Sequence, residues 1–276
     1  GICSACRASE EVTANALGIA GSMASGIIEY LGDGSWTKRM HPGWAAQSAL
    51  RACAIAQAGF VGPKAVFEGT HGVFNTFAPS IDPRPEQLFK DLGAHWVTET
   101  IALKPYPCGS MIQPYIDCAI QLKQRGVSLD GIESVVCKTA EGIVHRLWEP
   151  LELKRQPPNA YAAKFSTPFG VALGLVRGQA GLNDYTEEAV SDNDLLRIAN
   201  LVDFEIDPDD PYPDVFTGHV RLVYANGRVE EAEQGFVRGG MDNPLSRQDI
   251  DAKFRANVTF GGSDNADRLL EACEQI

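Results

Sequence analysis

The sequence predicts an α+β protein with a helical front, a middle of mixed helices and strands, and a helical tail. Apolar and small side chains recur at helical spacing over residues 10–31 and again from about residue 43 to residue 58. Residues 132–140 are rich in β-branched side chains, as in a strand. Two alternating segments flank Asn226-Gly227 within residues 218–236, which predicts a β-hairpin with a type I′ turn.

The helical front carries two local signals. Gly18 and Gly21 would weaken an isolated helix, so their place in the first helical segment predicts tight packing, of which close helix–helix contact is the usual form. Pro42 suits the first turn of the next helix, because the missing proline N–H is not needed there. That helix is therefore expected to begin near Gly43.

The proline-rich stretch 79–88 is the candidate domain boundary. We expect a partial helical domain over residues 1–85, an α+β domain over 86–238, and C-terminal helices over 239–276 that return to the helical domain. Within the last two parts, spacing and composition predict a strand ending at Leu103, helices over about 111–126 and 167–177, a helix capped near Ser191 or Asp192, and helices over 246–258 and 265–276.

Composition narrows the function class. The 276 residues carry a net charge of −12 and a pI of about 4.9, which disfavours binding to nucleic acid or to anionic membranes. No apolar run reaches the length of a membrane span, and "GICSACRASE" lacks the features of a signal peptide. Seven scattered cysteines fit reduced thiols, so a cytoplasmic location is expected. Motifs for nucleotide binding, zinc proteolysis and serine hydrolysis are absent from the sequence.

The first candidate site is the basic cluster Lys38, Arg39 and His41, which directly precedes the expected helix start. Free N–H groups and the positive end of the helix dipole would add to these charges, which favours carboxylate binding. Trp36 and Trp44 bracket the cluster and suggest that it is packed. The alternative is an exposed basic turn, the usual place of Lys and Arg.

The second candidate site is "LKPYPCGSMIQPY", residues 103–115. Lys104 follows the expected strand, Tyr106 lies in a proline-fixed turn, and Ser110 precedes the expected helix. A tight turn around a buried Cys108 is the alternative. Because both clusters place a lysine beside a helix start, a substrate with two or three carboxylates would suit the pair.

Four segments in this order resemble the MmgE/PrpD family: "ANALGIAGSMASGIIEYLGDGSWTKRMHPGWAAQSAL", "GFVGPKAVFEGTHGVFNTF", "LKPYPCGSMIQPYIDCA" and "AKFSTPFGVALGL". The family includes 2-methylcitrate dehydratase, cis-aconitate decarboxylase and iminodisuccinate epimerase. The resemblance implies a helical domain with a smaller α+β lid domain, a homodimer, and a cleft that acts on small polycarboxylates without metal or organic cofactor. A 2-methylcitrate dehydratase of propionate metabolism is the reaction we expect first, with decarboxylation and epimerisation as alternatives.

Site residues follow from the resemblance, position by position. Lys38, His41 and Lys104 are expected to be catalytic, by stabilising an enolate-like anion, and Lys38 or His41 by relaying a proton. The residues expected to contact substrate are Arg39, Tyr106, Ser110 and Gln113.

The sequence departs from the family in two ways. The early part of the helical domain, which supplies an aspartate and a histidine to the site, is expected to be missing, so the chain would be a fragment or would need a partner chain. Some relatives carry a histidine in place of Gln113 and an aromatic hydroxyl in place of Phe169. The competing hypothesis is therefore a family remnant that binds an anion or dimerises without turnover.

Overall fold

The computed structural model describes residues 1–80, 82 and 84–275, in two compact units, Gly1–Trp96 and Val97–Ile276. Each unit is described by itself. The first is helical and the second carries a four-stranded sheet, so the predicted α+β class is confirmed. The division at residues 85 and 238 stays a prediction.

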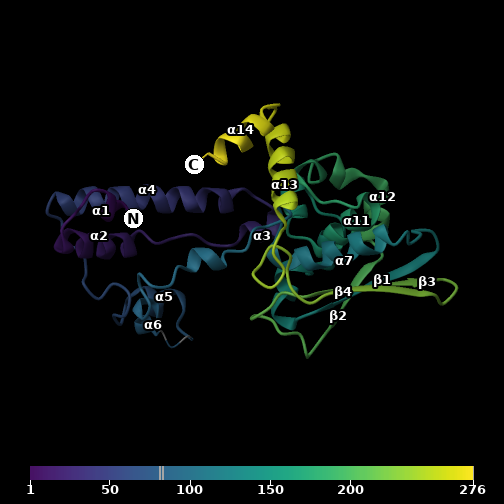
Figure 1. Cartoon of the computed structure of the whole chain (residues 1–276). Helices are drawn as coiled ribbons and strands as arrows, with labels where there is room; N and C mark the ends of the chain where they lie inside the picture. Colours follow the sequence, from purple (N-terminus) through teal and green to yellow (C-terminus); the bar gives the residue numbers. More distant parts are fainter. Residues whose placement is uncertain (81, 83, 276) are drawn as a thin grey trace. The chain divides into compact units, whose positions relative to one another are not determined.

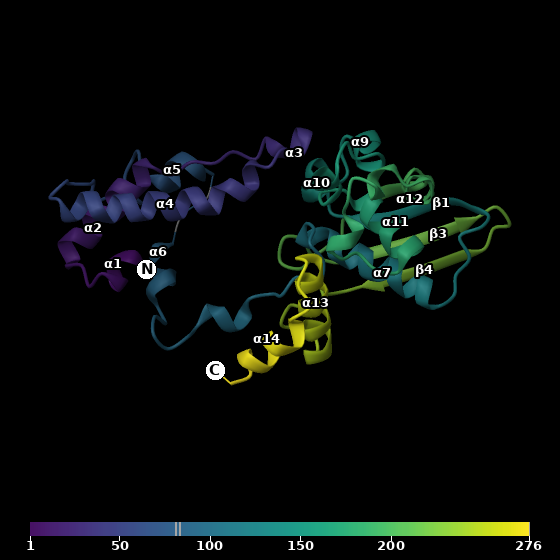
Figure 2. The same cartoon turned by 90° about the horizontal axis from the view of Figure 1, so that it is seen from above.

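The first unit is built on two helices that lie side by side, α2 and α4 (Figure 1; Figure 2 shows them from above). Ala16 and Ile19 of α2 pack against Ala52 and Ala56 of α4 in a small core. The helices of this unit are α1 (Ile2–Ala5), α2 (Glu10–Ser22), α3 (Tyr30–Asp33), α4 (Thr37–Gln57), α5 (Val73–Phe77) and α6 (Pro85–Phe89).

The predicted tight packing at Gly18 and Gly21 is confirmed, but the neighbour is a loop and not the helix that was expected. A Cβ added at Gly18 would lie 2.5 Å from the carbonyl oxygen of Pro63, and one at Gly21 would lie 2.2 Å from a methyl of Val66. The glycines therefore let the backbone of residues 62–66 approach α2 directly.

Large apolar side chains remain exposed on this helical unit. Trp36 is 68% exposed and Trp44 is 44% exposed, so neither indole lies in the core of this unit. The core contacts of α4 use the small side chains of Ala52 and Ala56 instead.

The second unit contains most of the regular structure. Its strands are β1 (Ile132–Thr139), β2 (Val202–Ile206), β3 (Gly218–Tyr224) and β4 (Val229–Gln234). Its α-helices are α7 (Gln113–Gln124), α8 (Val144–Leu147), α9 (Leu151–Arg155), α10 (Ala160–Ala163), α11 (Thr167–Arg177), α12 (Asn193–Ala199), α13 (Arg247–Phe260) and α14 (Ala266–Cys273). Short 3₁₀ turns are Val97–Thr100, Ser110–Ile112, Glu141–Ile143, Leu182–Asp184 and Ala189–Ser191. Within the described residues, no helix is both long and apolar enough to span a bilayer.

The sheet has the strand order β2-β1-β3-β4, with β1 parallel to β2 and antiparallel to β3. The helix α7 packs on β3 and β4, and α11 packs on α7 (Figure 1). Alternating burial along β1 turns one face toward these helices, where Tyr115, Trp148 and Phe169 are fully buried. The predicted strand 132–140 and the predicted helices of this unit are thus confirmed.

The hairpin is confirmed, but its predicted type I′ turn is wrong. Gly227 has φ +80°, while the one described non-glycine residue with positive φ is Arg7, so Asn226 lacks the positive φ that type I′ requires. Gly227 N–H donates to Tyr224 C=O, and Tyr224 N–H donates to Arg228 C=O. This is a three-residue loop closed by a glycine bulge, which needs positive φ at the glycine alone.

The predicted strand ending at Leu103 is also wrong. Residues Val97–Thr100 form a 3₁₀ turn, and residues 101–104 belong to no strand. Leu103 N–H donates to Gly239 C=O, a bond outside any ladder. The β-branched composition therefore predicted a strand in a segment that is not part of the sheet.

Gly174 of α11 lies where this helix packs closely against α7. A Cβ at Gly174 would lie 2.5 Å from Cβ of Ala119 and 3.0 Å from the carbonyl oxygen of Ile116. Gly174→Ala should lower the free energy of unfolding by about 1–3 kcal/mol in denaturant titration, because this overpacking forces the helices apart. Gly43→Ala is the matched control: Gly43 is an exposed helical glycine with nothing near its Cβ position, so the change should stabilise by about 0.5–1 kcal/mol. Equal effects would contradict the close packing.

Candidate functional site

The first candidate cluster lies on a helix and not in the turn before it. The helix α4 begins at Thr37, so Lys38, Arg39 and His41 occupy its first turns, and Pro42 lies inside it. The predicted start near Gly43 is therefore wrong. Pro42 removes the N–H that would bond to the carbonyl of Lys38, a defect tolerated close to a helix start. The helix places no acidic side chain in its first turn, so these cations add to the positive end of its dipole.

Tyr30 connects the two candidate catalytic residues of this cluster. The ammonium of Lys38 lies 5.6 Å from the centre of the buried Tyr30 ring, and the His41 ring packs edge-on to Tyr30 at 6.0 Å. Arg39 stacks over Trp36 at 4.8 Å. Cation–π contacts of this kind orient lysine and arginine without neutralising them.

A cavity of 520 Å³ opens beside His41. Its lining includes Thr37, Tyr30 and also the carboxylates Glu29 and Asp33. The backbone N–H of Ser35 donates to Asp33 at 2.8 Å and lowers the pKa of that carboxyl, which keeps it ionised. Of the basic cluster, His41 lines this cavity, whereas Lys38 and Arg39 are not among its lining residues.

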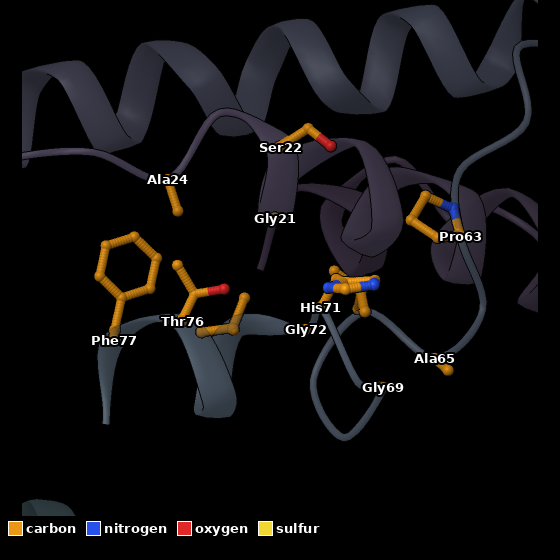
Figure 3. A pocket seen from close by; sticks show the side chains of 12 residues that line it. Gly21, Ser22, Ala24, Pro63, Ala65, Gly69, His71, Gly72, Thr76 and Phe77 are labelled. Carbon is orange, nitrogen blue, oxygen red and sulfur yellow. The ribbon is translucent and has the colours of Figure 1, made fainter. Parts of the chain in front are cut away.

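A second cavity of the helical unit, of 420 Å³, lies between α2 and α5. Figure 3 shows Thr76 and Phe77 of α5 facing Gly21 and Ser22 of α2, with His71 at the far end. Its walls are mainly glycine and apolar side chains, so His71 is the titratable group that it presents.

In the second unit, Lys104 stands on an exposed turn over a buried thiol. Its ammonium donates to the carbonyl of Cys108 at 3.1 Å. Burial raises the pKa of the Cys108 thiol to about 12, against the charges of Lys104 and Lys164. The thiol is therefore neutral and inert, and the turn presents an ammonium as its charged group.

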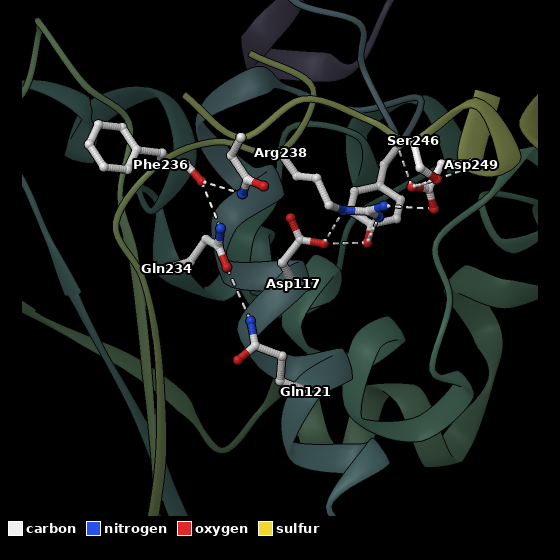
Figure 4. Close-up of polar contacts among 9 residues, drawn as sticks. Asp117, Gln121, Gln234, Phe236, Arg238, Ser246 and Asp249 are labelled. Atoms are coloured by element: carbon white, nitrogen blue, oxygen red, sulfur yellow. Dashed lines mark hydrogen bonds and ion pairs between the residues drawn. The ribbon is translucent and has the colours of Figure 1, made fainter. Parts of the chain in front are cut away.

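Tyr106 is held in a buried ionic network (Figure 4). Its hydroxyl donates to Asp117 at 2.6 Å, and Arg238 donates to the same carboxylate at 3.1 Å and to the Tyr106 oxygen at 2.8 Å. Arg238 also reaches Asp249 at 3.4 Å. Burial raises the pKa of Tyr106 and of Asp117, so Tyr106 stays protonated as a donor. The network joins the turn, α7 and α13.

Gln113 and Ser110 take up different positions near this turn. Gln113 is 1% exposed, and its amide donates to the carbonyl of Tyr106 at 3.4 Å. Ser110 is half-buried and opens the 3₁₀ turn that leads into α7. Phe169 is fully buried beside Tyr185. The structure thus places Lys104, Tyr106, Ser110 and Gln113 at one end of α7. The polar groups of Tyr106 and Gln113 form hydrogen bonds within the protein.

Two further lysines contact this turn, although their positions in the sequence did not connect them with it. The ammonium of Lys253, from α13, donates to the carbonyl of Lys104. Lys164 lies 5.8 Å from the centre of the Tyr185 ring, and its carbonyl accepts from Gly109 N–H at 2.9 Å. Lys253 is 149 positions away from Lys104, and no spacing rule connects the two. Lys164 lies within the segment "AKFSTPFGVALGL", one of the four that resemble the family, and this was the sequence signal that could have pointed to it.

Lys154 supports the segment that carries Lys164. Its side chain is buried, with the ammonium donating to the carbonyls of Arg146 at 2.8 Å and Phe165 at 2.9 Å. Ser166 donates in turn to the carbonyl of Lys154 and accepts from Phe169 N–H, which caps α11. Burial lowers the pKa of Lys154 to about 8.

This pKa predicts a pH dependence of stability. Between about pH 8 and pH 10.4 the unfolded chain keeps the Lys154 proton and the folded chain loses it, so raising the pH favours folding. Relative to Lys154→Met, the wild-type free energy of unfolding should rise by about 1–2 kcal/mol from pH 8 to pH 10. Urea titrations of both proteins measure this difference. A difference that stays constant across the range would contradict a lowered pKa.

Across residues 1–80, 82 and 84–275, no group of three or more His, Cys, Asp or Glu side chains is arranged to hold a metal ion. All seven cysteines are free thiols. Cys3 of the Cys3-Cys6 pair lies 3.6 Å from the buried Cys53 of α4, sulfur to sulfur.

Two family profiles match this chain, one over each part. The profile of the MmgE/PrpD C-terminal domain matches residues 106–275, and that of the MmgE/PrpD N-terminal domain matches residues 1–86. The chain belongs to the MmgE/PrpD family. Lys38 and His41 fall in the part matched by the N-terminal profile, and Tyr106 begins the part matched by the C-terminal profile.

Relatives in this family share about a quarter of their residues with the chain. It is 25% identical to the cis-aconitate decarboxylase-like protein oryM of Aspergillus oryzae, over 90% of the chain and 53% of that relative. It is 27% identical to a cis-aconitate decarboxylase of Aspergillus terreus, over 95% and 55%, and 24% identical to that of Mus musculus, over 87% and 49%. The chain spans about half the length of the curated relatives it matches.

Proposed function

We propose that this MmgE/PrpD protein is a cofactor-independent lyase that acts on a small polycarboxylate. The observation that carries the proposal is the pair of lysines at the turn after Leu103, Lys104 and Lys253, next to a neutral thiol and a protonated tyrosine. Family membership and the names of three relatives support a lyase reaction.

The decarboxylation and the dehydration named for the family pass through the same type of high-energy intermediate. When cis-aconitate loses its allylic carboxylate as CO₂, the electron pair of that C–C bond forms a new double bond. The old double bond then places its pair on the carbon next to another carboxylate, where a proton adds. Dehydration of 2-methylcitrate removes a proton next to a carboxylate before hydroxide leaves. Both pass through an enolate-like polyanion, which fixed cations stabilise.

The residues take roles that follow from their chemistry. Lys104 would hold a substrate carboxylate and stabilise the developing charge, because a fixed ammonium close to an oxyanion attracts it. His41 would relay the proton, and Lys38 beside Tyr30 would share the electrostatic role. Arg39 and Ser110 would contact other carboxylate or hydroxyl oxygens.

A homodimer is part of this proposal. The helical unit exposes large apolar side chains, for example Ile27 at 75% and Leu50 at 59%, which a protein–protein contact would cover. The cytoplasmic location and the role in propionate metabolism stay predictions from the sequence.

A substrate screen tests the proposal. The protein is incubated with cis-aconitate, 2-methylcitrate, citrate and iminodisuccinate, and each compound is followed by ¹H NMR against a sample without protein. We expect one of them to be consumed catalytically. The names of the relatives now favour cis-aconitate over 2-methylcitrate, which the sequence alone had put first. Binding of these compounds without any consumption would contradict the enzyme and support the remnant that binds anions.

A further inference from the structure

A pocket of 310 Å³ lies between the segment 102–104 and α13, within the second unit. This volume is at the lower end of the range of about 300–1,000 Å³ usual for small-molecule sites. Lys104 and Lys253 supply its charge, and Leu103, Ile250 and Phe254 supply apolar walls. Asn257 adds an amide. One wall comes from the turn and the other from a helix about 150 positions later in the chain.

The two ammonium groups are bound by backbone carbonyls and keep donors for a ligand. Lys253 donates to the carbonyl of Lys104, and Lys104 donates to the carbonyl of Cys108. Each ammonium has three N–H donors, so two remain on each. In the described part of the chain, neither lysine forms an ion pair with a carboxylate.

The lysine pair is unfavourable without a counter-ion. Burial and then the charge of Lys104 lower the pKa of Lys253, against the effect of Cys108. Two ammonium groups that line one pocket repel each other, and an anion bound there would remove that cost. The groups around them therefore favour a carboxylate with a short hydrocarbon part.

Rigid contacts hold Lys253 in this position. Ser246 and Asp249 form a capping box at the start of α13, and Arg238 joins Asp249 to the buried Asp117 (Figure 4). Lys253 follows Asp249 by one helical turn, on the same side of α13. The network thus fixes the register of α13 against the Lys104 turn.

We propose that this pocket is a carboxylate subsite in which Lys253, together with Lys104, binds one carboxylate of the polycarboxylate substrate. Ile250 and Phe254 then pack against the carbon chain beside it, and Asn257 binds a neighbouring oxygen. Lys253 determines specificity by charge and is not itself required for proton transfer. The inference rests on the proposed function for the identity of the substrate, but anion binding by the pocket can be measured without turnover.

The test uses propane-1,2,3-tricarboxylate, which has neither hydroxyl nor double bond and so cannot undergo either lyase reaction. Its dissociation constant is measured by isothermal titration calorimetry for the wild type, Lys253→Met, Lys253→Gln and Lys253→Arg. Lys253→Gln keeps a donor for the Lys104 carbonyl but removes the charge. Arg255→Met, in the same helix but outside the pocket lining, is the control.

We expect Lys253→Met and Lys253→Gln to weaken binding about 10- to 100-fold, and Lys253→Arg and Arg255→Met to stay within about threefold of wild type. The salt dependence of binding should fall in the first two variants only. With a turned-over substrate, KM should rise in both while kcat changes less than about threefold.

Two outcomes would overturn the inference: wild-type binding in Lys253→Gln, or no binding to the wild type. Its failure differs from failure of the proposed function. Turnover of a polycarboxylate with Lys253-independent binding removes only the subsite. Lys253-dependent binding of propane-1,2,3-tricarboxylate without turnover of any substrate removes only the lyase.

Discussion

Lys104→Ala should lower kcat/KM for the polycarboxylate by about 100- to 1,000-fold, the usual cost of removing one donor to a developing oxyanion. Lys104 is exposed and bonds to a single backbone carbonyl, so the variant should unfold at the same denaturant concentration as the wild type. Steady-state kinetics and urea titration measure the two quantities. The combination of lost activity and kept stability assigns the lysine to the site.

Lys123→Ala is the matched control for this variant. Lys123 is another exposed lysine of the same unit, and it too donates to one backbone carbonyl, that of Val176 at 2.7 Å. Its removal should leave kcat/KM within about twofold. Unchanged kinetics in Lys104→Ala, or an equal loss in both variants, would remove Lys104 from the proposed site.

Arg238→Met should destabilise the protein by about 3–5 kcal/mol, because it leaves Asp117 buried without its cation. The Asp117 carboxylate is 6% exposed, and its second oxygen has no hydrogen-bond partner among the described residues. The variant would also free Tyr106 and Asp249, and so loosen α13 from the Lys104 turn. Chemical denaturation of the variant and the wild type gives the difference.

A variant at a surface ion pair is the control, because it shows the effect of removing an arginine that is not buried. Arg255 pairs with Asp267 at 2.8 Å, with both side chains about half or more exposed, so Arg255→Met should cost less than about 1 kcal/mol. Asp117→Asn combined with Arg238→Met should be more stable than Arg238→Met alone, since the uncompensated charge is gone. Additive losses in the double variant would contradict the buried ion pair.

Helices and strands were predicted correctly from the sequence where a strong local signal was present. The helix Thr167–Arg177, the strand Ile132–Thr139 and the hairpin after Gly218 each combine a clear period with a cap or turn residue. The predictions failed where the deciding contact is not local. The segment before Lys104 has strand composition but no neighbouring strand, and Asn226-Gly227 fits two hairpin loops that differ only in the φ of Asn226.

Lys38, His41 and Lys104 were proposed from the sequence because motifs mark those positions, and their roles stay predictions. The start of α4 was missed because Pro42 usually marks a first turn, whereas here the chain accepts it in the second. Lys253, Arg238 and the network at Asp117 were missed for a different reason. Their roles come from the docking of α13 on the turn, which joins residues more than 100 positions apart.

Deuterium incorporation shows whether the protein moves a proton at a carbon next to a carboxylate. The protein is incubated in D₂O with cis-aconitate and, separately, with 2-methylcitrate, and ¹H NMR is recorded against samples without protein. We expect that a C–H signal next to a carboxylate is lost or replaced by its deuterated form in at least one of the two. Full retention of every such signal in both compounds, at a protein concentration where calorimetry shows them bound, would contradict it.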